Sequence, residues 1–250
     1  MEDNFMGLQS SRNMNLADPI IIAGLGGLGG GVIDSLKGKI KNDYDDINRV
    51  EMRIVDMTSH VKKTHITNDE ITILDSRGTD CDRTLGQSIF RDEKVYEGIR
   101  SEFKTLIEKM ISIAGEDHIN VLIASGIVGG TGGGIFVDFT YMIHDLFREC
   151  HHKNYSICAY MFDAESTDDQ DEKNQQMKLN GQEALKELQH NMNITTQEHL
   201  YHATIGQREI TCRKTLFEEY KHISFCLGDD DKLDDLKKRM STLMIEEFLY

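Results

Sequence analysis

The sequence predicts a three-layer α/β protein, in which a mainly parallel, Rossmann-related sheet carries helices on both faces. Short apolar runs alternate with amphipathic helical patterns along the whole chain, an order typical of parallel sheets covered by helices. Pro19 is the one proline in 250 residues, so few forced breaks interrupt long elements. Two glycine clusters each lie between an apolar run and a helical pattern, which indicates two strand–turn–helix units.

The first predicted elements form a strand–helix–strand–strand series. The run Ile20–Ala23 is apolar, β-branched and followed by glycines, which indicates a strand buried on both faces. Apolar residues then recur at helical spacing, so Gly29–Ile40 is a predicted helix. Met52–Val55 is the second predicted strand and ends at Asp56, and Ile71–Leu74 is a short third one.

The middle of the chain predicts two helices around a central strand. Glu93–Ala114 has a continuous apolar face, and Gly115 is a suitable end for this helix. His118–Ala124 contains an unbroken apolar run that is typical of a central strand. The helix Ile135–Arg148 follows the second glycine cluster.

The last third continues the alternation. We predict strands at Tyr155–Phe162 and His222–Leu227, and helices at Asn174–Met192 and Lys232–Tyr250. The acidic segment Ser166–Lys173 is predicted to be a surface loop or a helix entry. We expect three parts in the whole chain: an N-terminal extension (1–18), one nucleotide-binding domain (19–231) and a C-terminal helix (232–250).

Charge and composition exclude several classes of protein. The chain has 43 acidic and 28 basic residues, a formal net charge of −15, so it lacks the basic excess of a general nucleic-acid binder. No run approaches the roughly 18 apolar residues of a membrane span. The first 18 residues contain no apolar core of a secretory signal. We therefore expect a cytoplasmic protein that binds no nucleic acid and does not span a membrane.

The first glycine cluster, Gly24–Gly31, joins a predicted strand to a predicted helix. Glycines allow a tight turn and a close approach of ligand to backbone, and the helix N-terminus directs N–H groups and a positive dipole at the turn. This arrangement is typical of phosphate binding. The candidate binding residues here are Gly24, Gly26, Gly27, Leu28, Gly30 and Gly31.

The second cluster, Ser125–Gly134, has the same setting. Turns at the carboxyl ends of neighbouring strands face one cleft, so together they suit a nucleoside di- or triphosphate. Neither turn contains lysine, so neutralisation of the phosphates is expected from backbone dipoles and Mg²⁺. The candidate binding residues here are Gly129, Gly130, Thr131, Gly132 and Gly133. We predict no metal site made by the protein alone.

These turns resemble those of the tubulin/FtsZ superfamily. Its GGGTG(T/S)G signature is similar to Val128–Gly134, which reads VGGTGGG, with Val128 in place of the first glycine and Gly133 in place of Thr/Ser. Gly24–Gly31 resembles the first phosphate loop of the family. The resemblance extends over roughly Ile20–Leu233 and is specific at the two turns.

Other segments resemble the family less specifically. Asp56 stands where the family has a polar residue after its second strand, and Arg77-Gly78-Thr79, with Leu85-Gly86, resembles the loop that senses the terminal phosphate. The segment Phe225–Leu233 resembles the region where the family reads guanine with an asparagine; here Asp229 or Asp230 would accept hydrogen bonds from the base. The helix after the fifth strand is similar in four residues: Asn180, Ala184, Leu185 and Leu188.

The resemblance implies a bacterial tubulin-like protein that binds GTP or GDP with Mg²⁺. It also implies nucleotide-dependent self-assembly, as a homo-oligomer or filament, or recruitment of a partner protein. In the family an acidic loop beyond a long central helix completes the GTPase site of the next subunit, and this sequence ends at Tyr250, within or just after that helix. We therefore expect a fragment or a shortened relative, assign no catalytic residue, and do not expect GTPase activity of the chain alone.

Three alternatives remain open from the sequence. The run IIIAGLGGLGGGV also resembles the ThiF and ubiquitin-activating enzymes, in which Asp56 would hold ribose for ATP-dependent adenylation; this leaves the second cluster without a role. A nicotinamide-dependent oxidoreductase would use Asp56 in the same way, without an accompanying catalytic His/Lys/Tyr set. A scaffold that lost its nucleotide is disfavoured by the nearly intact glycine turns.

Overall fold

The computed structural model describes residues 18–43, 49–57, 64–166, 172–193, 200–227 and 230–248. Its centre is a six-stranded sheet in the order β3-β2-β1-β4-β5-β8, and each neighbouring pair of strands is parallel. The strands of this sheet are β1 (Ile20–Leu25), β2 (Val50–Asp56), β3 (Ile71–Ile73), β4 (Ile119–Gly126), β5 (Tyr155–Ser166) and β8 (Glu219–Leu227). The predicted parallel α/β sheet is confirmed.

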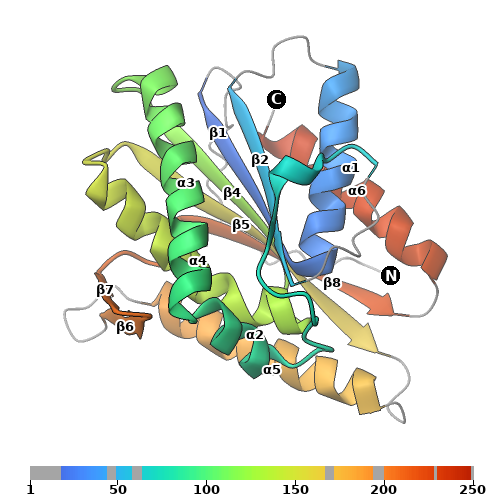
Figure 1. Cartoon of the computed structure of the whole chain (residues 1–250). Helices are drawn as coiled ribbons and strands as arrows, with labels where there is room; N and C mark the ends of the chain where they lie inside the picture. Colours follow the sequence, from blue (N-terminus) through green and yellow to red (C-terminus); the bar gives the residue numbers. More distant parts are fainter. Residues whose placement is uncertain are drawn as a thin grey trace.

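Helices cover both faces of the sheet (Figure 1). Two helices pack on one face, α1 (Gly26–Asp43) and α6 (Asp230–Phe248). Four pack on the other face: α2 (Arg83–Phe90), α3 (Glu93–Ala114), α4 (Gly130–Glu149) and α5 (Glu172–Met192). A 3₁₀ turn, Asn68–Glu70, precedes β3. The predicted three-layer architecture is therefore also confirmed.

The two central strands of the sheet, β1 and β4, are buried along their whole length. Alternate residues of β1 enter different cores, because successive side chains of a strand point to opposite faces. Ile21 and Ala23 pack in the core under α3 and α4, whereas Ile20 and Ile22 pack in the core under α1 and α6. This two-sided burial explains why the strand sequences are continuous apolar runs.

Several element boundaries differ from the prediction. The helix Glu93–Ala114 is confirmed, with Gly115 as its C-cap. However, α1 begins at Gly26 rather than Gly29, and α4 at Gly130 rather than Ile135. Glycine's low helix propensity favoured a loop at these positions, but packing of each first turn against the sheet edge overrides that preference.

The segment between β5 and α5 also differs. Ser166 ends β5 and Glu172 already opens α5, so the predicted surface loop Ser166–Lys173 is only partly a connection. The predicted N-terminal extension, apart from Asp18, lies outside the described residues. No helix among the described residues is both long enough and apolar enough to cross a membrane.

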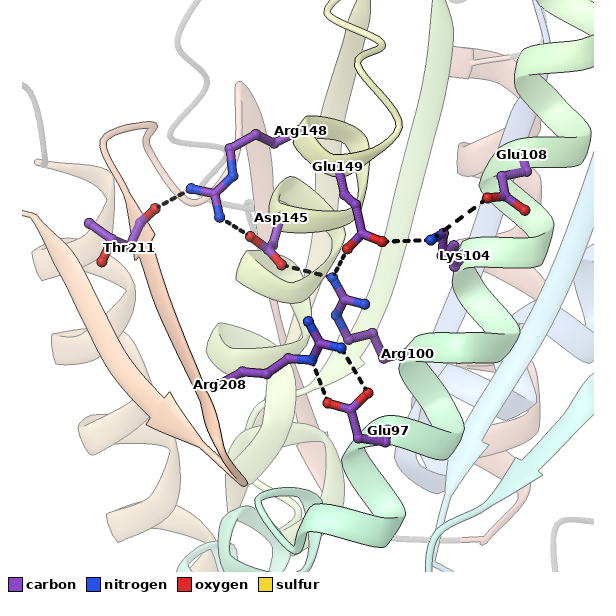
Figure 2. A network of polar contacts seen from close by, with 9 residues as sticks. All are labelled: Glu97, Arg100, Lys104, Glu108, Asp145, Arg148, Glu149, Arg208 and Thr211. Atoms are coloured by element: carbon purple, nitrogen blue, oxygen red, sulfur yellow. Dashed lines mark hydrogen bonds and ion pairs between the residues drawn. The ribbon is translucent and has the colours of Figure 1, made fainter.

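A β-hairpin that the sequence analysis did not predict lies on the outside of α3 and α4 (Figure 1). It consists of β6 (Tyr201–Ile205) and β7 (Arg208–Cys212), which pair antiparallel. A charged network fastens it: Arg208 pairs with Glu97 of α3, and Arg148 of α4 donates to the carbonyl of Thr211 at 3.1 Å. Figure 2 shows the Arg208–Glu97 pair beside a separate chain of contacts, which runs from Arg148 through Asp145, Arg100, Glu149 and Lys104 to Glu108.

Candidate functional site

The two glycine turns lie side by side at the carboxyl edge of the sheet. Strands β1 and β4 are neighbours, and Leu25 pairs in register with Ser125, so both strands end at the same level. The chain continues outward from β1 to β2 on one side and from β4 to β5 on the other. Ligands of open α/β sheets bind at such a reversal of strand order.

Most glycines of the first turn are required for packing against protein. A Cβ at Gly24 would lie 2.8 Å from the carbonyl oxygen of Gly29, and one at Gly30 would lie 2.8 Å from Cγ2 of Ile54. A Cβ at Gly29 would collide with the carbonyl oxygen of Ala124. These glycines therefore let α1 pack closely on the sheet, a role that Gly24 and Gly30 have in addition to the predicted role in ligand binding.

The other residues of the first turn face three different neighbours. A Cβ at Gly31 would lie 2.9 Å from Cε of Lys237 in α6, and the side chain of Leu28 packs on Gly126. Gly27, by contrast, is exposed, and the nearest atom to a Cβ there would be Oδ2 of Asp56 at 3.9 Å. Gly27 is the open position of this turn.

The second turn shows the same division. A Cβ at Gly132 would lie 2.6 Å from the carbonyl oxygen of Gly126, and one at Gly133 would collide with the carbonyl of Ile127. Gly129 is the N-cap of α4, has extended backbone angles, and makes no side-chain cap hydrogen bond. The nearest atom to a Cβ at Gly129 would be the carbonyl oxygen of Gly126 at 3.7 Å, so this position is also open.

The two turns touch each other. Gly26 adopts a positive φ of 70°, which glycine tolerates, and a Cβ there would lie 2.9 Å from the amide nitrogen of Gly132. The same Cβ would lie 3.3 Å from Cβ of Thr131. The N-termini of α1 and α4 therefore adjoin, and the first N–H groups of a helix have no acceptor within it. Two adjacent helix N-termini form a site for anions.

Two polar side chains lie at this site. Asp56 ends β2, is 6% exposed, and accepts a 2.7 Å hydrogen bond from the amide of Met57 on Oδ1. Ser125 is the last residue of β4 that pairs with β1, and its side chain lies beneath Gly132. Its hydroxyl is buried and has no hydrogen-bond partner among the described residues. Sequence reasoning missed Ser125. Among the described residues, no group of three or more His, Cys, Asp or Glu is placed to hold a metal ion.

The loop 77–82 packs on the second turn. Gly78, Asp80 and Cys81 all have positive φ, a conformation that is costly for the last two residues. Thr79 is buried, and its side chain fills the position next to Gly130 where a Cβ would stand. The sequence-predicted Gly78 and Thr79 are thus brought to the second turn.

The flanks of this loop are held by aspartates. A hydrogen bond from Arg77 lowers the pKa of Asp75 to about 2. Asp82 caps α2 by accepting from the amide of Leu85 at 2.9 Å. The loop therefore has defined ends in spite of its unusual backbone.

Helix α5 contributes a residue whose contacts the sequence did not predict. Asn180 is 1% exposed and donates to carbonyl oxygens of both the loop 77–82 and the second turn. A usable signal was present, since Asn180 is a polar residue on the stripe that continues through Ala184 and Leu188. The two remaining candidates cannot be placed: Asp229 and the side chain of Asp230 lie outside the described residues.

A protein-family model described as "Tubulin like" matches residues 64–223, more than half of the chain. The chain belongs to the tubulin-like family. The matched range of this tubulin-like chain includes the loop 77–82, the second glycine turn and α5, and it begins after the first turn. No curated protein matches the sequence significantly. The family assignment does not favour the alternative of an adenylating enzyme.

Solved structures with the same fold include two kinds of tubulin-like protein. TubZ of Clostridium botulinum phage c-st has 12% identity and a TM-score of 0.55, and it covers 92% of this chain and 59% of its own. TubZ of Bacillus thuringiensis serovar israelensis, in GDP-form protofilaments, has 12% identity and a TM-score of 0.58, and the match covers 96% of this chain and 57% of that one. The GDP-bound monomer of CetZ1 from Haloferax volcanii has 13% identity and a TM-score of 0.52, and the match covers 90% of this chain and 58% of that one. This tubulin-like chain thus spans less than three fifths of each of these proteins.

Proposed function

We propose that this tubulin-like chain binds GTP or GDP, together with Mg²⁺, between its two glycine turns. We further propose that the nucleotide controls assembly of the chain with copies of itself, or with a partner protein, in the bacterial cytoplasm. The observation that carries the proposal is the contact of Gly26 with Gly132 and Thr131, which brings two helix N-termini together. Backbone N–H groups converging from two helices suit a ligand with several phosphates.

The open positions support a ligand at this place. Gly27 and Gly129 lie one at each helix start, and a side chain at either would project into free space. The hydroxyl of Ser125 is fully buried beneath Gly132 and belongs to the protein interior, so the support for a ligand rests on these two open positions.

Charge balance requires a cation. Neither turn has a lysine, and the carboxylate of Asp56 lies near the open side of Gly27, where it would repel phosphate. Mg²⁺ removes this conflict because it binds carboxylate and phosphate oxygens together. We propose Asp56 and the Thr131 hydroxyl as the protein groups nearest to the metal.

The identity of the base rests on the family. The CetZ1 structure is described as GDP-bound, and the Bacillus TubZ protofilaments as a GDP form. We therefore propose guanine for this chain, with Asp229 or Asp230 accepting its hydrogen bonds. We assign no catalytic residue.

The test is a titration of the full chain with GTP, ATP and NAD, each with Mg²⁺, repeated on Gly129→Val. We expect binding of GTP by the unmutated chain and a loss of about a hundredfold or more in Gly129→Val, since the side chain would occupy the phosphate position. The backbone of Gly129 has negative φ, so valine fits without strain. Gly130→Val is unsuitable because its side chain would collide with Thr79.

Gly98→Val is the matched control. Gly98 is exposed on α3, and no atom lies within 4 Å of the position of its Cβ. This variant should bind GTP like the unmutated chain. Tighter binding of ATP or NAD, or an unchanged affinity in folded Gly129→Val, would overturn the proposed function.

A further inference from the structure

The carboxamide of Asn180 joins three parts of the molecule. Its Nδ2 donates to the carbonyl of Cys81 at 2.6 Å and to the carbonyl of Val128 at 2.9 Å. Its Oδ1 accepts from Nε2 of Gln176 at 2.9 Å, within the same helix. With a side chain 1% exposed, Asn180 holds α5, the loop 77–82 and the second glycine turn together in the protein interior.

The two carbonyl groups that Asn180 contacts belong to segments whose backbone conformation must be held by other parts of the protein. Cys81 has a φ of 66° and Asp80 a φ of 43°, and such conformations persist only where the surroundings hold them. Val128 directly precedes Gly129, the open N-cap of α4. One side chain therefore fixes a strained loop relative to the backbone that starts the second turn.

Two further polar links between α5 and these segments are more exposed. Lys173 pairs with Asp80 at 3.3 Å, but both side chains are more than half exposed, so water and salt weaken the pair. Arg83 donates to the carbonyl of Gly133 at 2.9 Å and pairs with Glu187 of α5 at 2.6 Å. Of these links, the one made by Asn180 is the buried one that reaches the loop 77–82 itself.

We propose that Asn180 is a positioning residue that makes the chain distinguish a nucleoside triphosphate from a diphosphate. The inference rests on the proposed function, because it concerns the same site. The loop 77–82 places Thr79 against Gly130, so a terminal phosphate on the second turn lies next to this loop. We assign the terminal phosphate of a triphosphate to this position, which a diphosphate would leave empty, and a loop already held in place binds that phosphate without a further ordering cost.

The test compares Asn180→Asp with Asn191→Asp. The first change keeps the shape of the side chain but removes the two N–H donors. Asn191 is a matched control on the same helix: it is 6% exposed, donates to the carbonyl of Glu187 at 2.8 Å and accepts from Tyr141 at 3.2 Å. Both variants lose buried hydrogen bonds of α5, and only the first loses its contact with the site.

The readout is the ratio of the affinities for GTPγS and GDP, measured on the full chain with Mg²⁺. We expect Asn180→Asp to lower the preference for GTPγS about tenfold, a usual size for coupling between neighbouring sites, and Asn191→Asp to leave the ratio unchanged. If Asn180→Asp does not fold, Asn180→Ala takes its place. An unchanged ratio in the folded Asn180 variant, or an equal change in the control, overturns the inference.

A second readout needs no nucleotide. Amide hydrogen exchange of residues 78–86 in the nucleotide-free chain should accelerate in Asn180→Asp and not in Asn191→Asp, because the loop loses its buried tether. Equal protection from exchange in both variants would show that Asn180 does not tether the loop. Failure of the unmutated chain to bind either nucleotide overturns the proposed function, and discrimination with it, whereas binding with an unchanged ratio overturns the role of Asn180 alone.

Discussion

At the scale of single residues, the glycines of the two turns serve two purposes. Only glycine fits at three of these positions, because neighbouring backbone leaves no room for a Cβ at Gly24, Gly29 or Gly132. Gly27 and Gly129 have room, and they are the ones that face the proposed ligand. Sequence reasoning located both turns but could not separate these roles, since the distinction depends on which atoms of other elements approach each position.

Asp56 gives a prediction for metal dependence. Its Oδ1 is held by the amide of Met57, and its Oδ2 lies toward Gly27. In Asp56→Asn we expect GTP binding to lose most of its dependence on Mg²⁺, with an affinity about tenfold lower at saturating Mg²⁺, or ~1.4 kcal/mol. The measurement is a GTP titration at several Mg²⁺ concentrations. The same Mg²⁺ dependence in variant and unmutated chain would show that Asp56 does not contact the metal.

His144 is buried in α4 and has a structural role. Its ring nitrogens lie 2.9 Å from the hydroxyl of Tyr155 and 3.2 Å from the carbonyl of Leu216. The carbonyl only accepts, so Nε2 carries the proton and Nδ1 accepts from the tyrosine. Burial lowers the pKa of His144 to about 4.

This pKa predicts an acid-sensitive contribution to stability. The unfolded chain protonates His144 below a pH of about 6.5, whereas the folded chain does so only near 4, so unfolding takes up a proton between these values. Stability is complete above pH 6.5 and falls as the pH decreases toward 4, by up to about 3 kcal/mol. His144→Gln retains hydrogen-bonding groups and does not titrate. Urea unfolding at pH 7.5 and 5 should show a smaller loss for this variant, and an equal loss would refute the assignment.

At the scale of elements, the hairpin β6–β7 is anchored on a buried charge. Asp138 of α4 is 1% exposed, accepts from the Tyr201 hydroxyl at 2.7 Å, and pairs with Arg91 at 2.6 Å. The ring of Tyr201 also stacks on Tyr141, with centroids 3.7 Å apart. One carboxylate thus connects the hairpin, α4 and the turn before α3.

Removing these partners should have unequal effects. Arg91→Ala leaves the buried carboxylate of Asp138 without its cation and should lower the free energy of unfolding by about 3 kcal/mol. Tyr201→Phe removes one hydrogen bond and should cost about 1 kcal/mol. Arg77→Ala is the control, since Arg77 forms a similar pair with Asp75 at the surface and should cause no measurable change. Urea unfolding compares the three, and a loss in Arg77→Ala as large as in Arg91→Ala would contradict this account.

The elements that sequence reasoning found are those with strong periodicity. The long helix Glu93–Ala114 has an uninterrupted apolar stripe and was predicted with its observed ends. Helix α2 has only eight residues, including Gly86, and offers little pattern. The hairpin was missed because its stability comes from Asp138, Arg148 and Glu97 on distant helices, and local sequence does not contain such contacts.

At the scale of the whole molecule, the alternation of elements was enough to predict the sheet and its layers. The adjacency of the two turns followed from the general rules for parallel α/β sheets, whereas the strand order β3-β2-β1-β4-β5-β8 was not predicted. The contact of the loop 77–82 with α5 did not follow, because it depends on left-handed residues and on one buried amide, Asn180.

Assembly gives a prediction for the whole molecule. Copies of a chain with a net charge of −15 repel one another, so assembly should increase with ionic strength. Under the proposed function, assembly should also depend on the nucleotide. We expect more of the chain to sediment with GTPγS and Mg²⁺ than with GDP. Equal sedimentation with the two nucleotides, or none at any protein concentration, would contradict the proposal of nucleotide-controlled self-assembly.

The most direct measurement is a crystal or cryo-EM structure of the full chain with GTPγS and Mg²⁺. We expect phosphate oxygens within hydrogen-bond distance of backbone N–H groups of both turns, beside Gly27 and Gly129. We also expect a metal ion on the side of Asp56. A nucleotide bound elsewhere, or one that contacts only a single turn, would contradict the central claim that the two helix N-termini form one polyphosphate site.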